Sequence, residues 1–249
     1  MQIQICDAGP WRSLVTTDSD RMKQNAAESA VSEIRSGMIV GLGTGSTATF
    51  ATSALGKRIQ QGLKIIGIPT STQTEAQAKS LGIPLSTLDE YQDIDLTIDG
   101  ADEVERSTLN LIKGYGGALL REKIVARATK RLIIIADESK LVEKLGTRHF
   151  VPVEVVPFGW RVAARKIQNL GGEPSLRMKP DGSVFLTDGG HYILNCAFGL
   201  IKKPAALAND LDHVVGVVEH GLFIGMTSEV RIGGAESVQV LRSERGESA

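Results

Sequence analysis

The chain has 249 residues, and its 28 Lys and Arg against 29 Asp and Glu give a formal net charge of -1 at pH 7. This balance argues against nucleic acid or an anionic membrane as the main partner, and it leaves room for a local basic pocket that binds a small anion. No apolar run approaches the ~20 residues that span a bilayer, and the N-terminal segment lacks the apolar core of a signal peptide. The two cysteines, Cys6 and Cys196, fit free thiols in a reducing compartment, so we expect a cytoplasmic protein.

Predicted strands and helices alternate through the first 148 residues. Apolar residues at helical spacing predict a helix that begins at Asp18 or Ser19 and ends near Gly37. Short apolar runs predict buried strands at residues 38–42, 64–68, 94–98 and 131–136, with helices between them through about residue 55, at 72–80 and at 118–129. This alternation indicates βαβ units. We therefore expect a Rossmann-like α/β domain with a doubly wound parallel sheet over residues 1–148, rejoined by residues 215–249.

The pattern changes after Gly146. Strands are predicted at residues 151–156, 176–178, 183–187, 192–197 and 214–218, and helices at residues 162–170 and 205–211. Pro180-Asp181-Gly182 is a hairpin turn signal. The order β-α-β-β-β-α-β predicts a second, smaller α+β domain over residues 149–214, ferredoxin-like with one extra strand. The stretch 228–241 is expected to return to the first sheet.

A glycine-rich turn, Gly43-Thr44-Gly45-Ser46-Thr47, follows the first predicted strand. Glycines such as Gly45 let the backbone approach an anion, and the N-terminus of the next helix offers unpaired N–H groups. The hydroxyls of Thr44, Ser46 and Thr47 can donate to phosphate oxygens. The turn also matches a dinucleotide fingerprint, but the end of the second strand carries no acid to bind a ribose. A turn that only packs the helix on the strand is the alternative.

Hydroxyl side chains also follow the second strand, in Pro69-Thr70-Ser71-Thr72-Gln73-Thr74. Ligands of open α/β sheets bind outside the carboxyl ends of the strands. Ser71 is therefore a candidate contact for a small polar ligand. Thr and Ser are equally common as helix caps, so this motif leaves both interpretations open.

Three carboxylates follow the third strand, in Asp99-Gly100-Ala101-Asp102-Glu103. Asp99 and Asp102 could converge across Gly100, and crowded carboxylates raise one another's pKa into the range of a useful base. A capped, solvated loop is one alternative, and a weak magnesium site on this trio is another. The four histidines form no zinc pattern, so we expect no metal.

Lys113 precedes a glycine cluster that opens the next predicted helix. Its ammonium could share a developing oxyanion with neighbouring backbone N–H groups. These are the N–H groups of Gly114, Gly116 and Gly117. Glu122 could point back toward this loop, although its position also fits a surface helix residue. Lys140 follows the next strand and adds a lysine at the same edge.

Together these segments resemble the type A ribose-5-phosphate isomerases. The shared motifs are Gly43 to Thr47, Asp99-Gly-Ala-Asp102-Glu103, Lys113-Gly-x-Gly-Gly, Arg121-Glu122-Lys123, Ala136-Asp-x-Ser-Lys140, Thr187-Asp188-Gly189 and Val217 to Phe223. The resemblance covers about residues 21–241. It implies a two-domain homo-oligomer, a dimer or tetramer. It also implies an isomerase without cofactor or metal that interconverts D-ribose 5-phosphate and D-ribulose 5-phosphate in the non-oxidative pentose phosphate pathway.

The resemblance also implies a role for each matching residue. Glu122 would move the proton between C1 and C2, and Lys113 would bind the substrate and stabilise the enediolate. Asp99 would assist ring opening and hydroxyl proton transfer, with Asp102 beside it. The residues implied to hold the 5-phosphate or neighbouring hydroxyls are Thr44, Ser46, Thr47, Lys140 and Lys23.

Three positions depart from the family pattern. Tyr115 stands where many members have glycine, His191 where asparagine is frequent, and Asn195 where an acidic residue is common. None is a catalytic position, so these departures bear on substrate affinity or domain contacts.

Two other functions compete with this interpretation. A dehydrogenase is disfavoured by the missing ribose-binding acid. A non-catalytic sugar-phosphate sensor would normally bring a helix-turn-helix and a basic surface, and neither is visible before Asp18. A sensor would also have no use for Glu122, Asp99 and Lys113 together.

Overall fold

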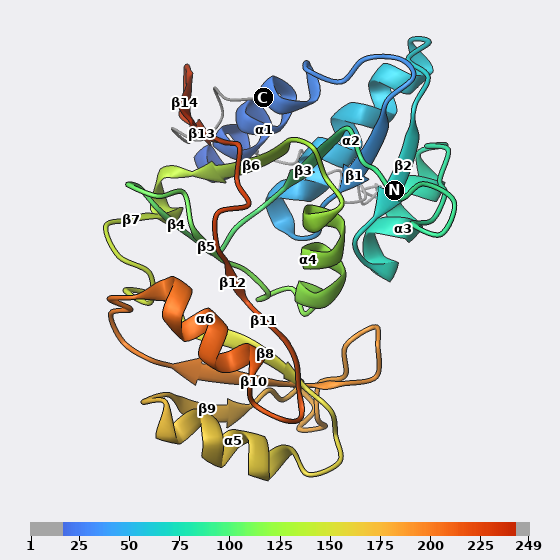
Figure 1. The fold of residues 1–249 in the computed structure, drawn as a ribbon. Helices are drawn as coiled ribbons and strands as arrows, with labels where there is room; N and C mark the ends of the chain where they lie inside the picture. Colours follow the sequence, from blue (N-terminus) through green and yellow to red (C-terminus); the bar gives the residue numbers. More distant parts are fainter. Residues whose placement is uncertain (1–16, 243–249) are drawn as a thin grey trace, which may run out of the picture.

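The computed structural model describes residues 17–242, which form an α/β protein with a mainly parallel six-stranded sheet (Figure 1). The strand order is β14-β13-β6-β3-β1-β2. The bounds are β1 (Ile39–Leu42), β2 (Ile66–Pro69), β3 (Leu96–Asp99), β6 (Leu132–Asp137), β13 (Glu229–Gly233) and β14 (Val238–Arg242). All neighbours pair in parallel except β13 and β14. The predicted strands and the return of 228–241 to this sheet are confirmed; Cys6 lies outside the described residues.

Helices cover both faces of this sheet, which explains why its strands are apolar on both sides. They are α1 (Asp18–Val31), α2 (Ser46–Gln60), α3 (Thr72–Ser80) and α4 (Leu119–Arg127). Residues of α1 and α2 pack with Val40 and Ile98 in one buried cluster, whereas Val125 of α4 packs with Ile68 in another. No helix within residues 17–242 is long and apolar enough to cross a membrane.

The first helix differs from its prediction at both ends. Thr17 is its N-cap and accepts the Asp20 N–H, so the predicted caps Asp18 and Ser19 are already helical. The helix ends at Val31, and Gly37 (φ +93°) instead shapes the turn into β1.

A second, antiparallel sheet has the order β11-β8-β10-β9 and forms the lower part of Figure 1. Its elements are β8 (Val151–Val155), α5 (Trp160–Asn169), β9 (Glu173–Leu176), β10 (Tyr192–Ala197), α6 (Pro204–Asp212) and β11 (Val217–His220). The predicted strand at 183–187 is wrong, because this segment makes only an isolated bridge between Met178 and Val184. Its Leu186 is half exposed, although the next residue, Thr187, is buried. Because β11 pairs with β8, the second sheet continues to His220, past the expected boundary at residue 214.

A third sheet, absent from the sequence prediction, lies between the other two and has the order β12-β5-β4-β7. Its elements are β4 (Glu103–Glu105), β5 (Leu111–Ile112), the 3-10 helix η1 (Glu138–Lys140), β7 (Leu141–Val142) and β12 (Leu222–Phe223). Strands of two or three residues carry no readable periodicity. This sheet places Lys113, which directly follows β5, opposite the end of β3.

Candidate active site

The carboxyl ends of β1 and β3 meet at one edge of the parallel sheet. The Thr44 N–H, just after β1, donates to Asp99 Oδ1 at the end of β3 over 3.0 Å. A Cβ on Gly43 would overlap the Asp99 carboxylate, so only glycine allows this approach. The turn after β1 and the end of β3 therefore form one wall of the site.

The Thr44 hydroxyl lies in a buried cluster of hydroxyls. Its Oγ1 is 2.7 Å from Thr70 Oγ1, 2.8 Å from Ser71 Oγ and 3.1 Å from Thr74 Oγ1. Ser71 is also the N-cap of α3 and accepts the Thr74 N–H over 3.1 Å. These hydroxyls bond to one another, so the segment after β2 supports the turn after β1 from behind.

Lys113 joins two of the predicted acidic residues. Its Nζ lies 3.1 Å from Asp99 Oδ2 and 3.4 Å from Glu122 Oε1, and it donates to the Gly100 carbonyl over 2.6 Å. All three charged side chains are at most 4% exposed. Burial alone would lower the pKa of Lys113, but the charges of Asp99 and Glu122 raise it above its ordinary value. Lys113 is therefore a buried ammonium between two carboxyl groups.

The two oxygens of the Glu122 carboxyl group differ in their contacts. Its Oε1 faces Lys113, whereas its Oε2 is buried and has no hydrogen-bond partner among the described residues. Burial raises the pKa of Glu122 to about 8; the Lys113 charge opposes this shift, and the Asp99 and Asp102 charges add to it. The alternative of a surface helix residue is wrong, since Glu122 lies buried in the first turn of α4.

The glycine loop after Lys113 closes another side of the site. Asp102 Oδ2 accepts the Tyr115 N–H over 3.0 Å. Gly117 has a φ of +80°, and a side chain there would collide with Phe185. The hydrogen bond to Asp102 and the close contact with Phe185 therefore hold the loop in place.

A cavity of about 70 Å³ lies between these segments. It is lined by Thr44, Gly45, Ser46, Thr47, Gly100, Ala101, Asp102, Lys113, Gly114, Gly116, Glu122 and Lys140. The predicted residues that do not line it are Asp99, Ser71, Gly117 and Lys23. Asp99 binds Lys113 and Ser71 binds Thr44, so these two touch the lining from behind. Lys23 lies on α1.

The third acidic residue of the trio, Glu103, turns away from Asp99 and Asp102. It is fully buried and accepts the N–H groups of Gly146, Arg148 and His149 over 2.7, 2.7 and 2.8 Å. Its carboxylate thus holds a loop of the third sheet, and the alternative of a magnesium site on all three carboxylates is wrong.

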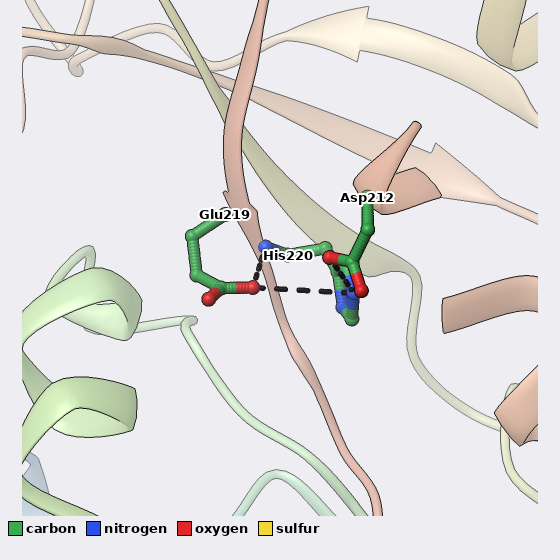
Figure 2. Close-up of side chains that lie close together, drawn as sticks. All are labelled: Asp212, Glu219 and His220. Carbon is green, nitrogen blue, oxygen red and sulfur yellow. Dashed lines mark hydrogen bonds and ion pairs between the residues drawn. The ribbon is translucent and has the colours of Figure 1, made fainter. Parts of the chain in front are cut away.

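Asp212, Glu219 and His220 form a second charged group, away from the cavity (Figure 2). Their ligand atoms lie close enough to suggest a metal site, but the Lys123 ammonium already donates to Glu219 Oε1 and to the His220 carbonyl, both over 2.6 Å. His220 Nδ1 accepts the Leu222 N–H over 3.2 Å, and burial together with the Lys123 charge lowers the pKa of His220 to about 3. A divalent cation would have to displace this ammonium, so we assign the group a structural role.

A family model described as ribose 5-phosphate isomerase A (phosphoriboisomerase A) matches residues 66–237. The chain belongs to this family. The matched segment contains Lys113 and the three acidic residues near it, Asp99, Asp102 and Glu122.

Individual members of the ribose 5-phosphate isomerase A family agree with this assignment. The chain is 57% identical over 225 residues to ribose-5-phosphate isomerase A of Synechococcus sp. (strain JA-3-3Ab), covering 90% of this chain and 98% of the relative. The solved ribose 5-phosphate isomerase A from Methanocaldococcus jannaschii superposes with a TM-score of 0.87 at 40% identity, over 90% of this chain and 100% of that one. A D-ribose-5-phosphate isomerase in complex with phospho-erythronic acid has a TM-score of 0.87 at 36% identity, over 91% and 100% of the two chains.

Two charged residues near the site of this family member carried no functional prediction. Lys123 anchors α4 to β11, and Arg177, from the second sheet, donates to the carbonyls of Gly114 and Tyr115. Lys123 was visible only as part of the Arg121-Glu122-Lys123 motif. The signal for Arg177 was indirect: its partner Asn195 is one of the departures from the family pattern.

Proposed function

We propose that this chain interconverts D-ribose 5-phosphate and D-ribulose 5-phosphate through an enediolate. The observation that carries the proposal is the buried Glu122 carboxyl group, which has an unpaired oxygen beside the Lys113 ammonium in a cavity. Aldose-ketose isomerisation needs a base that takes a proton from one carbon and returns it to the next. It also needs donors for the oxygens that become charged.

Glu122 is the proposed base. A pKa of about 8 lets the group ionise and be protonated again near neutral pH, which suits a group that takes and returns the same proton. Its carboxylate would remove the proton from C2 of the aldose and deliver it to C1. The Oε2 atom is available for this contact because no residue within 17–242 binds it.

Lys113 and Asp99 are proposed to act on the oxygen atoms of the substrate. The Lys113 ammonium, fixed by Asp99 and the Gly100 carbonyl, would stabilise the enediolate, and a preorganised donor of this kind contributes roughly 3 kcal/mol. Asp99 would assist ring opening and hydroxyl proton transfer, with Asp102 beside it. In this proposal the buried Lys113 and Asp99 side chains form an ion pair, and each also has a role in the reaction.

The N-terminus of α2 is the proposed phosphate site. Gly45 is its N-cap and supplies no side-chain cap, so the first N–H groups of the helix are available to an anion. Ser46 and Thr47 add hydroxyls, and Lys140 adds a positive charge on the lining of the same cavity. Binding the phosphate there supplies binding energy away from the reacting carbons. Lys23 stays a proposed phosphate contact that would have to reach the ligand from α1.

Neither a cofactor nor a metal is needed for this reaction. The Lys113 ammonium stands between the carboxylates that could otherwise hold a divalent ion, and its charge repels one. The glycine-rich turn is proposed to bind phosphate rather than a dinucleotide, so NAD and NADP should not bind.

An assay of ribose 5-phosphate turnover after exhaustive EDTA treatment tests the proposal, and activity should survive. Loss of activity that magnesium or manganese restores would show that the carboxylates are metal ligands. Binding of ribose 5-phosphate without any turnover would favour the sensor. Micromolar affinity for NAD would favour a dehydrogenase.

We also propose the finer description of the fold. Helices on both faces of the main sheet support a Rossmann-like, doubly wound domain, and the order β11-β8-β10-β9 supports a ferredoxin-like second domain. The pairing of β11 with β8 supports a domain boundary after His220. The enzyme is proposed to act in the cytoplasm, in the non-oxidative pentose phosphate pathway, without nucleic-acid or membrane partners.

A homo-oligomer, most simply a dimer, is proposed as the working form. Phe158 and Val215 are 95% and 93% exposed, and each lies within two residues of the hydrogen bond between the Val156 N–H and the Gly216 carbonyl. Two exposed apolar side chains at one end of the second sheet fit a contact with a second copy. Light scattering should show more than one chain per particle and a smaller particle for Phe158→Ser; an unchanged mass would contradict this contact.

A further inference from the structure

Arg177 connects the second sheet to the glycine loop of the site. It directly follows β9, and its Nη1 donates to the carbonyls of Gly114 and Tyr115 over 3.0 and 3.1 Å. Its Nε and Nη2 donate to Asn195 Oδ1 over 3.0 and 2.7 Å. The side chain thus uses both edges of its fork, one on the loop and one on β10.

These two carbonyl contacts help to fix where the loop amides point, together with the Gly117 N–H, which also donates to the Gly114 carbonyl over 3.0 Å. In a trans peptide the C=O and the following N–H point in opposite directions, and the described residues contain no cis peptide. The Gly114 carbonyl faces Arg177, and the Tyr115 N–H accordingly faces Asp102 on the other side, over 3.0 Å. By the same rule, the Tyr115 carbonyl on Arg177 turns the Gly116 N–H away from the guanidinium.

The Gly116 N–H therefore points away from Arg177, on a loop that borders the cavity. Gly116 lines the cavity and lies beside Thr44, another lining residue. Within residues 17–242 no backbone acceptor is found for this N–H. An unpaired amide held in a fixed direction at a reaction site is the type of donor that stabilises a charged oxygen.

The surroundings of Arg177 hold it in place without neutralising it. Its guanidinium carbon lies 5.6 Å from the centre of the Phe185 ring, which packs against Gly117 of the same loop. Its hydrogen-bond partner Asn195 is neutral at a position where the family commonly has an acid. The orientation of the loop thus depends on hydrogen bonds rather than on a salt bridge.

We propose that Arg177 is a positioning residue that turns the Gly116 N–H of the glycine loop toward the reacting oxygens of the substrate. The second domain would then contribute to catalysis without touching the substrate. This inference rests on the proposed function, because it assigns the Gly116 amide to the charge of an enediolate.

Arg177→Met and Arg177→Lys, measured with ribose 5-phosphate and with phospho-erythronic acid as inhibitor, test this role. The acid carries a full negative charge on its carboxylate, as the enediolate does on its oxygens, whereas the substrate is uncharged there. Arg177→Met should lower kcat about 10- to 100-fold and weaken the inhibitor about 10-fold, while KM changes less than about 3-fold. Arg177→Lys, which cannot span both carbonyls and Asn195, should fall between Arg177→Met and the unmodified enzyme.

Three controls separate orientation from other effects. Arg165→Met, an exposed residue of α5 on the same sheet, should leave all constants unchanged. Asn195→Asp still accepts both hydrogen bonds, so it should keep kcat within about 3-fold. Circular dichroism and thermal unfolding should show that Arg177→Met is folded.

Results from either variant could overturn the inference. For a folded Arg177→Met variant, these results are an unchanged kcat, or a KM and an inhibitor affinity that change by the same factor. For Asn195→Asp, the result is a loss of activity as large as that of Arg177→Met. An unmodified enzyme that fails to turn over ribose 5-phosphate would instead overturn the proposed function.

Discussion

Two neighbouring residues of α4 lead into two different buried clusters of charge. Glu122 and Lys123 are 4% and 5% exposed, and each lies among side chains of opposite charge. On the Glu122 side, the carboxyl group has an oxygen without a partner, and the burial that strips it of water raises its pKa to about 8. On the Lys123 side, the ammonium is bound by Glu219 and by the His220 carbonyl, and His220 is held neutral.

The two clusters differ in hydrogen-bond satisfaction: Glu122 Oε2 has no partner among the described residues, whereas the Lys123 ammonium donates to Glu219 and to the His220 carbonyl. The cavity beside Lys123 is the larger, about 310 Å³ against about 70 Å³ beside Glu122. Cavity volume alone would favour the Lys123 cluster, which is not the one proposed to be catalytic. A buried polar atom without a partner costs folding free energy. Such atoms occur among the described residues in Glu122, Glu154 and Thr227, and of these residues Glu122 lines the small cavity.

The largest effect is expected from Glu122→Gln, which removes the base and keeps the shape of the side chain. We expect kcat to fall about 10²- to 10⁴-fold, the usual contribution of a general base, with ribose 5-phosphate binding retained. Steady-state kinetics and calorimetric binding measure the two parts separately. Near-normal turnover would show that Glu122 belongs with Lys123 on the structural side of the comparison.

Lys113→Ala should have the next largest effect on the reaction. Removal of the ammonium leaves Asp99 and Glu122 facing each other and deprives the enediolate of a donor. The expected loss of transition-state stabilisation is roughly 3 kcal/mol, or about 10²-fold in kcat/KM. A variant that loses substrate affinity but keeps kcat would show that Lys113 only binds the sugar.

Lys123→Met should affect stability and leave the reaction nearly intact. The substitution leaves the partly buried Glu219 carboxylate without its ammonium partner. This should lower the free energy of unfolding by about 3 kcal/mol. Lys79→Met is the matched control, because the Lys79–Glu75 pair is exposed and should change stability by less than about 0.5 kcal/mol. Urea unfolding gives both values. A loss of kcat as large as that of Glu122→Gln would contradict the structural role.

A further expected effect is a pH dependence of stability assigned to Glu122. Burial raises its pKa from an ordinary 4.5 to about 8, so the folded state favours the uncharged carboxyl group. Its contribution to stability is therefore fully present below about 4.5 and is lost as the pH rises through about 8. Unfolding free energies of the unmodified protein and of Glu122→Gln should converge at low pH and separate at high pH. Parallel curves would show that Glu122 titrates normally.

The main sheet and most of the site could be predicted from the sequence because both depend on local signals. Apolar strands and the turns after them place Thr44 and Asp99 at neighbouring strand ends, whereas Lys113 is positioned by the short strand β5, which the apolar pattern does not reveal. The contacts of Lys123 and Arg177 are not local. Lys123 contacts His220, 97 positions away in the sequence, and Arg177 contacts Gly114, 63 positions away. No spacing rule connects residues so far apart.

Two other positions depend on contacts that the sequence does not show. Ser71 supports Thr44 instead of lining the cavity, because its hydroxyl bonds to that of Thr44 and caps α3. Glu103 looks like the third member of an acidic trio, but the short strand β4 turns it toward three backbone N–H groups. A strand of three residues is too short to be recognised from the spacing of apolar residues.

The most direct test of the central claim is the rate at which the hydrogen on C2 of ribose 5-phosphate is lost, followed by NMR in D₂O. This rate counts proton removal itself, whether or not ketose forms. Glu122→Gln should slow it at least about 10²-fold, whereas Lys123→Met should keep it within about 3-fold of the unmodified enzyme. Equal rates for the two variants, both slow or both normal, would contradict the claim that Glu122 alone of these neighbours carries the proton.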